Sequence, residues 1–138
     1  MYFRGVTMKQ CYCCSGQPFE VCCRPFIEGA RKPLTAEALM RSRYTAYATM
    51  AVEYIIRTTH ISTRKYYDAA AISAWAASSA WKKLEIISTE KGLNTDTIGY
   101  VEFKAYYTDT NLRSQIHHEY STFKKDGDSW FFVDGKVS

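Results

Sequence analysis

The stretch that decides the fold class is Thr97–Thr108, which reads TIGYVEFKAYYT. Apolar and polar side chains alternate along it, and in an extended strand every second residue points to the same face of a sheet. One face would carry Val101, Phe103, Ala105 and Tyr107, and the other Tyr100, Glu102, Lys104 and Tyr106. This period of two predicts a strand with one face turned toward a core.

Strand signals continue on both sides of this stretch. A strand that opens with Leu84, Ile86 and Ile87 and ends near Gly92 precedes it, and residues 114–124 follow it as a third strand. Asp126-Gly127-Asp128 predicts a tight turn into a fourth strand at 130–133. Four strands joined by short connections predict an antiparallel meander.

Helical periodicity precedes the strands. Thr35 can cap a first helix, because its hydroxyl can accept a hydrogen bond from the first helical turn. The apolar stripe of this helix consists of Met40, Tyr44, Tyr47 and Ala51. A second helix is predicted over residues 52–60, and a third, capped by Ser62 or Thr63, over 64–77. About three helices followed by four strands predict an α+β fold in which the helices cover one face of the sheet.

All five cysteines lie within Cys11–Cys23, which reads CYCCSGQPFEVCC. Zinc is held by four soft ligands in a tetrahedron. We expect the ligands to be Cys11, Cys13, Cys22 and Cys23. Four thiolates leave the metal no open position, so the pattern indicates structural rather than catalytic zinc. Disulfides are the alternative, but adjacent cysteines bridge each other poorly and five thiols leave one unpaired.

The fifth thiol, Cys14, has three interpretations. It is a spare ligand that exchanges with a neighbour, a bystander, or a redox-sensing thiol.

The length of 138 residues fits one compact domain with a small appendage. We expect a zinc knuckle and connector at residues 8–32 and an α+β domain at 33–138. Residues 1–7 show no pattern and are interpreted either as an upstream extension or as a non-native remnant of cloning.

Charge and hydropathy narrow the function classes. The formal net charge is +4, and four thiolates with one zinc ion reduce it to 4 − 4 + 2 = +2. The basic residues alternate with acidic ones, which indicates a solvated surface rather than a nucleic-acid interface. There is no apolar run of about 20 residues and no signal-peptide pattern, so we expect no membrane contact and a cytoplasmic protein.

The pattern Cys-x-Cys-x8-Cys-Cys, with Ser15-Gly16 and Phe19 inside it, resembles the SEC-C motif, a zinc-binding segment of the SecA translocation ATPase. The motif usually has glycine where this chain has Cys14. The resemblance implies contact with a protein partner, as SecA-like proteins make with the SecB chaperone. The residues that it implies for this contact are Gln17, Phe19, Glu20 and Arg24.

The rest of the chain, to about residue 135, resembles the YchJ-type family of bacterial proteins. The segments that carry the resemblance are Leu39–Tyr44, Tyr54–His60, Trp81, Gly99–Phe103, His118–Phe123 and Trp130–Gly135. It implies a domain similar to nuclear transport factor 2 (NTF2), a cone of curved sheet wrapped around helices.

Such a cone often holds a pocket between sheet and helices. Its candidate lining residues here are Arg43, Tyr44, His60 and Glu119. A core-facing carboxylate needs a partner, so we expect Glu119 to pair with Arg43 or Arg41. A His118–Glu119 acid–base pair is disfavoured, because neighbouring strand residues point to opposite faces.

These observations favour a zinc-binding protein that acts as a protein-interaction or small-ligand-binding module. A homodimer is a further possibility that the sequence leaves open. The alternative is a small enzyme of hydrolase or lyase type, with Glu119, His60 and Arg43 as participants.

Overall fold

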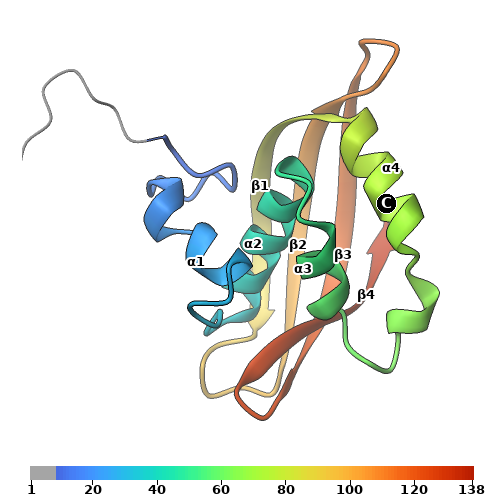
Figure 1. The fold of residues 1–138 in the computed structure, drawn as a ribbon. Helices are drawn as coiled ribbons and strands as arrows, with labels where there is room; N and C mark the ends of the chain where they lie inside the picture. The colour runs from blue at the N-terminus through green and yellow to red at the C-terminus, as the bar shows by residue number, and fades with distance from the viewer. Residues whose placement is uncertain (1–8) are drawn as a thin grey trace, which may run out of the picture.

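A computed structural model describes residues 9–138, so the predicted extension at residues 1–7 lies outside the described part of the chain. The chain folds into one four-stranded antiparallel sheet with helices on one face (Figure 1). The predicted α+β class is therefore confirmed.

The sheet follows the predicted meander. Its strands are β1 (Ala80–Lys91), β2 (Ile98–Thr108), β3 (Ser114–Asp126) and β4 (Ser129–Val137), in the spatial order β1-β2-β3-β4. The alternation in β2 has the predicted sense, with Val101, Phe103 and Ala105 buried. At the β1–β2 turn Gly92 has φ +76°, and an added Cβ there would lie 2.7 Å from the Cβ of Ala36. A side chain larger than hydrogen is excluded by both the backbone and the neighbour.

The helical elements are η1 (Phe19–Val21), α1 (Arg24–Ile27), α2 (Ala36–Ala48), α3 (Val52–Arg57), η2 (Arg64–Tyr66) and α4 (Ala69–Ser78). Thr35 caps α2 as predicted, since its Oγ1 accepts a hydrogen bond from the Ala38 amide at 3.0 Å. Helix α2 packs against α1, α3 and strands β1, β2 and β4, so it lies at the centre of the fold.

The predicted third helix is divided. Residues 64–66 form a 3-10 turn, and α4 begins only after Asp68, whose carboxylate accepts from the Ala71 amide at 3.1 Å. The expected cap at Ser62 or Thr63 is wrong, because Asp68 provides the side-chain acceptor instead. The second helix ends at Arg57, short of the predicted His60.

The core joins helices and sheet into one cluster. Its largest fully buried side chains include Leu39 of α2, Ile55 of α3, Val101 of β2 and Phe123 of β3. No helix within residues 9–138 has both the length and the apolar character needed to cross a bilayer.

Candidate functional site

The four predicted cysteine ligands lie together beside α2, next to Thr45 in its last turn. Their Sγ atoms all lie within 4.8 Å of one another. Cys13 Sγ is 3.6 Å from Cys22 Sγ, which is 3.9 Å from Cys23 Sγ. Four sulfurs about 2.3 Å from a central zinc ion would be about 3.8 Å apart, so the observed spacing fits a tetrahedral thiolate site. The cluster can hold a metal ion.

The loop between the two cysteine pairs is closed by its own hydrogen bonds. The Cys11 amide donates to Gln17 O at 2.9 Å, and the Cys14 amide donates to Cys11 O at 3.2 Å. Cys14 has φ +64° and Gly16 has φ +87°, both in the left-handed region. The strain of a side chain at φ +64° is a physical reason for the glycine that SEC-C motifs usually have at this position.

Cys14 itself lies outside the cluster. Its side chain is exposed, and its thiol donates to Tyr12 O at 3.7 Å rather than to another cysteine. The four sulfurs that meet are those of the other cysteines.

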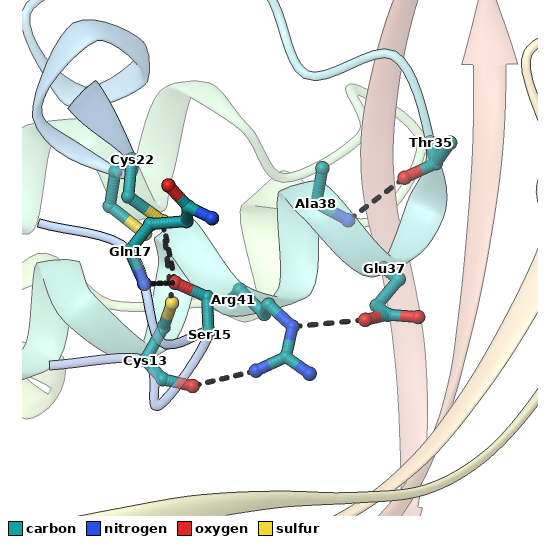
Figure 2. Close-up of polar contacts among 9 residues, drawn as sticks. Cys13, Ser15, Gln17, Cys22, Thr35, Glu37, Ala38 and Arg41 are labelled. Carbon is teal, nitrogen blue, oxygen red and sulfur yellow. Dashed lines mark hydrogen bonds and ion pairs between the residues drawn. The ribbon is translucent and has the colours of Figure 1, made fainter. Parts of the chain in front are cut away.

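Helix α2 holds the cysteine loop against the body (Figure 2). Arg41 donates through Nη1 to Cys13 O at 2.7 Å and through Nε to Glu37 at 2.9 Å. On the same helix Thr45 Oγ1 lies 3.7 Å from Cys11 Sγ. Cys11, Cys13 and Cys23 belong to the same buried cluster as the core of the body. The predicted appendage is therefore not separate from the body but shares its core, whereas the predicted boundary between residues 32 and 33 stays a prediction.

The crowding of the thiols changes their acidity. Hydrogen bonds from Cys13 and Cys23 lower the pKa of the Cys11 thiol. The interaction with Cys11, followed by burial, raises the pKa of Cys13 to about 11. Without a cation the cluster cannot hold four thiolates side by side, and a divalent metal supplies the missing positive charge.

A second site is a cavity of about 250 Å³ between α2, α4 and the covered face of the sheet. Half of its fourteen lining residues are aromatic, namely Tyr44, Tyr47, Tyr67, Trp75, Trp81, Phe103 and Phe132. The rings contact one another edge to face, with centroids 5.3 Å apart for Trp75 and Trp81 and for Tyr47 and Trp75. Val137, which is 65% exposed, lies at the rim.

Arg43 is the buried cation of this cavity, with 6% of its surface exposed. Its Nη1 donates to Ile55 O and to Thr58 Oγ1, both at 2.8 Å. The guanidinium carbon lies 4.4 Å from the ring centre of Phe132. Burial lowers the pKa of Arg43, because the charged form loses hydration.

Glu119 and His117, both on β3, form the second polar group that lines the cavity. His117 Nε2 lies 2.7 Å from Glu119 Oε1, and the Ser121 hydroxyl donates to Oε2. Burial alone would raise the pKa of Glu119, but the hydrogen bonds from His117 and Ser121 outweigh burial and place it below the ordinary value. Gly135 makes room for this carboxyl group, since an added Cβ would collide with Oε2.

The structure brings three of the four pocket candidates together. Arg43, Tyr44 and Glu119 line the cavity, but His60 does not. His60 instead lies 2.6 Å from Asp126 and 2.7 Å from Ser62, in contact with the ring of Phe131.

The predicted pairing of Glu119 with an arginine is wrong. No nitrogen of Arg41 or Arg43 approaches Glu119 within 4.0 Å, and Glu119 meets His117 instead. His117 was not among the predicted site residues, although the sequence holds a signal for it. Residues 117 and 119 are two apart on a strand and therefore share a face.

The chain is similar in sequence to known proteins over most of its length. Residues 35–135 match the family model described as the YchJ middle, NTF2-like domain. Over 91% of its length the chain is 49% identical to a UPF0225 protein of Geobacter sulfurreducens, of which 77% is covered. It is 36% identical, over 92% of its length, to a UPF0225 protein of Pectobacterium carotovorum, of which 83% is covered.

Two solved structures share the fold. The solution structure of a SEC-C motif containing protein from Rhodopseudomonas palustris has a TM-score of 0.85 at 34% identity, with 93% of this chain and 98% of that one covered. The crystal structure of a SEC-C motif containing protein from Psychrobacter arcticus has a TM-score of 0.77 at 31% identity, with 96% and 84% covered. The chain therefore belongs to the YchJ-type (UPF0225) family, in which a SEC-C cysteine segment is combined with an NTF2-like domain.

Proposed function

We propose that this protein is a cytoplasmic small-molecule-binding module whose cysteine loop is held in place by a structural zinc ion. The observation that carries the proposal is the cavity of about 250 Å³ under α2 and α4. A volume of this size equals the share of about eight water molecules in the liquid, which suits a small organic ligand.

The composition of the wall supports a binding site rather than a packing defect. Voids left by imperfect packing are apolar, because buried polar groups are costly unless they are paired. Here Arg43, His117 and Glu119 converge on an aromatic space. A few polar groups in a mostly apolar wall are typical of ligand sites.

The identity of the metal follows from the donor set. Four thiolates at tetrahedral spacing are the ligands that structural zinc prefers, and they leave no position for a substrate. In this proposal zinc fixes Cys11–Cys23 against α2, and the reduced thiols that it requires agree with a cytoplasmic location.

A binding experiment with a cavity-filling variant tests the proposal. The purified zinc-loaded protein is titrated with a library of small aromatic compounds while ¹⁵N–¹H NMR follows the indole signals of Trp75 and Trp81. Ala105 lines the cavity and is buried, so Ala105→Leu should abolish the shifts. Ala74→Leu, at an exposed position of α4, is the matched control and should leave them intact. Absence of any ligand-dependent shift, or binding unaffected by Ala105→Leu, would contradict the proposal.

A second candidate function is contact with a protein partner through the outer side of the cysteine loop. Val21 is 57% exposed beside the exposed Gln17 and Glu20, which gives this surface an apolar centre with polar neighbours. Phe19 is turned inward against Tyr12, and Arg24 is engaged by Glu20 and Glu28. Val21→Glu should abolish capture of a specific partner while metal content stays unchanged.

The alternative of a small enzyme is favoured by one feature, the His117–Glu119 contact. A carboxylate that accepts from one imidazole nitrogen leaves the other as a base, which is the usual arrangement of a general base and its orienting group. In this alternative His117 takes the role first assigned to His60.

A further inference from the structure

Arg43 has hydrogen-bond donors that the protein does not use. All of its hydrogen bonds within residues 9–138 are donated by Nη1, to Ile55 O, Thr58 Oγ1 and, at 3.4 Å, Thr59 Oγ1. In the described part of the chain, every side-chain nitrogen or oxygen that is fully buried has a hydrogen-bond partner. Nε and Nη2 of Arg43 have no such partner, so they are not fully buried. We infer that they face the cavity that Arg43 lines.

The acceptors around this guanidinium are neutral. Backbone carbonyls and threonine hydroxyls hold Nη1, whereas the nearest acid of the cavity, Glu119, is already bound by His117 and Ser121. The carboxylate oxygens of Glu119 lie more than 4.0 Å from the guanidinium nitrogens of Arg43, so the two groups form no ion pair. A buried guanidinium without an anionic contact is incompletely compensated, and an anion that reaches its two free nitrogens would supply what is missing.

The carboxylate of Glu119 in the same cavity favours a ligand with one negative charge over a ligand with two. Arg43 and the ionised Glu119 contribute +1 and −1. A dianion such as a phosphate monoester would experience the repulsion of Glu119, whereas a carboxylate can accept from both free nitrogens of one guanidinium.

The aromatic wall next to Arg43 indicates the shape and polarity of the part of the ligand that is not the anion. Phe132 stacks under the guanidinium, and the rings of Tyr47, Trp75 and Trp81, which contact one another, line the same cavity. Flat apolar groups fit such a wall, because aromatic rings prefer offset or edge-to-face contacts with other rings.

We propose that the cavity binds a small monocarboxylic acid with an aromatic or similarly flat apolar body, whose carboxylate is held by Nε and Nη2 of Arg43. This inference rests on the proposed small-molecule-binding function and adds the class of the ligand.

Three probes of one shape and different charge test the inference: 3-phenylpropanoate, 3-phenylpropanamide and 3-phenylpropylamine. Each is titrated into the zinc-loaded protein, and the dissociation constant is measured by calorimetry and NMR. We expect the carboxylate to bind about tenfold or more tightly than the amide, since a hydrogen-bonded charge contributes roughly 1.5–3 kcal/mol. The amine should bind most weakly.

Two variants should change carboxylate affinity in opposite directions. Arg43→Met should remove the preference for carboxylate over amide, and Glu119→Gln should increase carboxylate affinity, because it removes a negative charge from the cavity. Arg113→Met, at an exposed loop position whose side chain makes no hydrogen bond or ion pair in the described chain, is the control and should change neither. If Arg43→Met fails to fold, Arg43→Lys and Glu119→Gln still decide the question.

The outcomes separate the two proposals. Equal affinity for carboxylate and amide, both abolished by Ala105→Leu, overturns the acid specificity and leaves small-molecule binding standing. Tightest binding of the amine overturns the sign of the charge preference. No binding of any probe or library compound overturns both.

Discussion

Two arginines of helix α2 show how one element serves two sites of opposite character. Arg41 and Arg43 are two residues apart, about 200° around the helix, so their side chains lie on opposite faces. Arg41 donates to both Cys13 O and the carboxylate of Glu37, so its charge has an anionic partner beside the cysteine cluster. Arg43 keeps two nitrogens free beside the cavity. The cysteine site is closed by its own ligands, whereas the cavity retains unused bonding capacity.

The two sites therefore have different roles: the cysteine cluster is structural, and the cavity is the proposed ligand site. Four thiolates and a metal leave no position for a substrate, so the cluster contributes stability and position. The cavity has aromatic walls and polar groups without full partners, which are the properties of a site that accepts a ligand. Both sites are built on α2, so loss of the metal from the cysteine cluster should also weaken ligand binding in the cavity.

The largest expected effect is that of removing a metal ligand. Cys13→Ser should lower metal content from one equivalent to near zero and destabilise the protein by several kcal/mol, because metal binding and ordering of this loop are one event. Metal analysis combined with chemical denaturation measures both.

Cys14→Ser is the matched control for this experiment. Its thiol lies outside the cluster, so metal content and stability should stay at the wild-type level. Full metal content in Cys13→Ser, or its loss in Cys14→Ser, would show that the ligand set is wrong.

The next effect concerns the open site. Gly135→Ala places a methyl group where the Glu119 carboxyl lies, and we expect a loss of about 1–3 kcal/mol in the free energy of unfolding. Combined with Glu119→Ala, the same substitution should cost much less, because the collision is gone. A full cost in both backgrounds, measured by urea denaturation, would contradict the role of Gly135.

A smaller effect is expected at the contact between the two regions. Arg41→Met removes the bond to Cys13 O and should cost about 1 kcal/mol. It should also speed the loss of metal to a chelator. Glu37→Gln keeps the bond from Arg41 to the loop and is the control. Equal chelation rates for wild type and Arg41→Met would exclude a supporting role for Arg41.

The smallest effect is a pH dependence from Glu119. Its pKa in the folded protein lies below the ordinary value of 4.5, so this carboxylate stabilises the fold above pH 4.5. The contribution is lost as pH falls through the lowered pKa. The difference in unfolding free energy between wild type and Glu119→Gln, measured from pH 6 to pH 3, should therefore shrink toward acid. A constant difference would contradict the lowered pKa.

Local patterns predicted much of the fold. The alternation of Thr97–Thr108 is a property of neighbouring residues, and so are the Thr35 cap and the Asp126-Gly127-Asp128 turn. The four cysteines were identified for the same reason, because their chemistry and spacing are visible in one short segment. The break before α4 was missed because a general helical pattern does not reveal that Asp68 provides the cap.

The partners of the buried polar residues depend on contacts between distant segments. His60 meets Asp126, 66 residues away, and this contact takes it away from the cavity. Arg43 satisfies Nη1 on carbonyl and hydroxyl groups at the end of α3 rather than on the expected carboxylate. Such choices follow from how α3 packs on α2, which no pattern within either helix specifies.

The most direct test of the central claim is an NMR titration of the zinc-loaded protein with 3-phenylpropanoate. The claim predicts shifts of the indole signals of Trp75 and Trp81 and of the Arg43 Nε–H signal, with the amides of Cys11–Cys23 unchanged. Shifts concentrated in the cysteine loop, or no shifts at the two indoles, would contradict the assignment of ligand binding to the cavity.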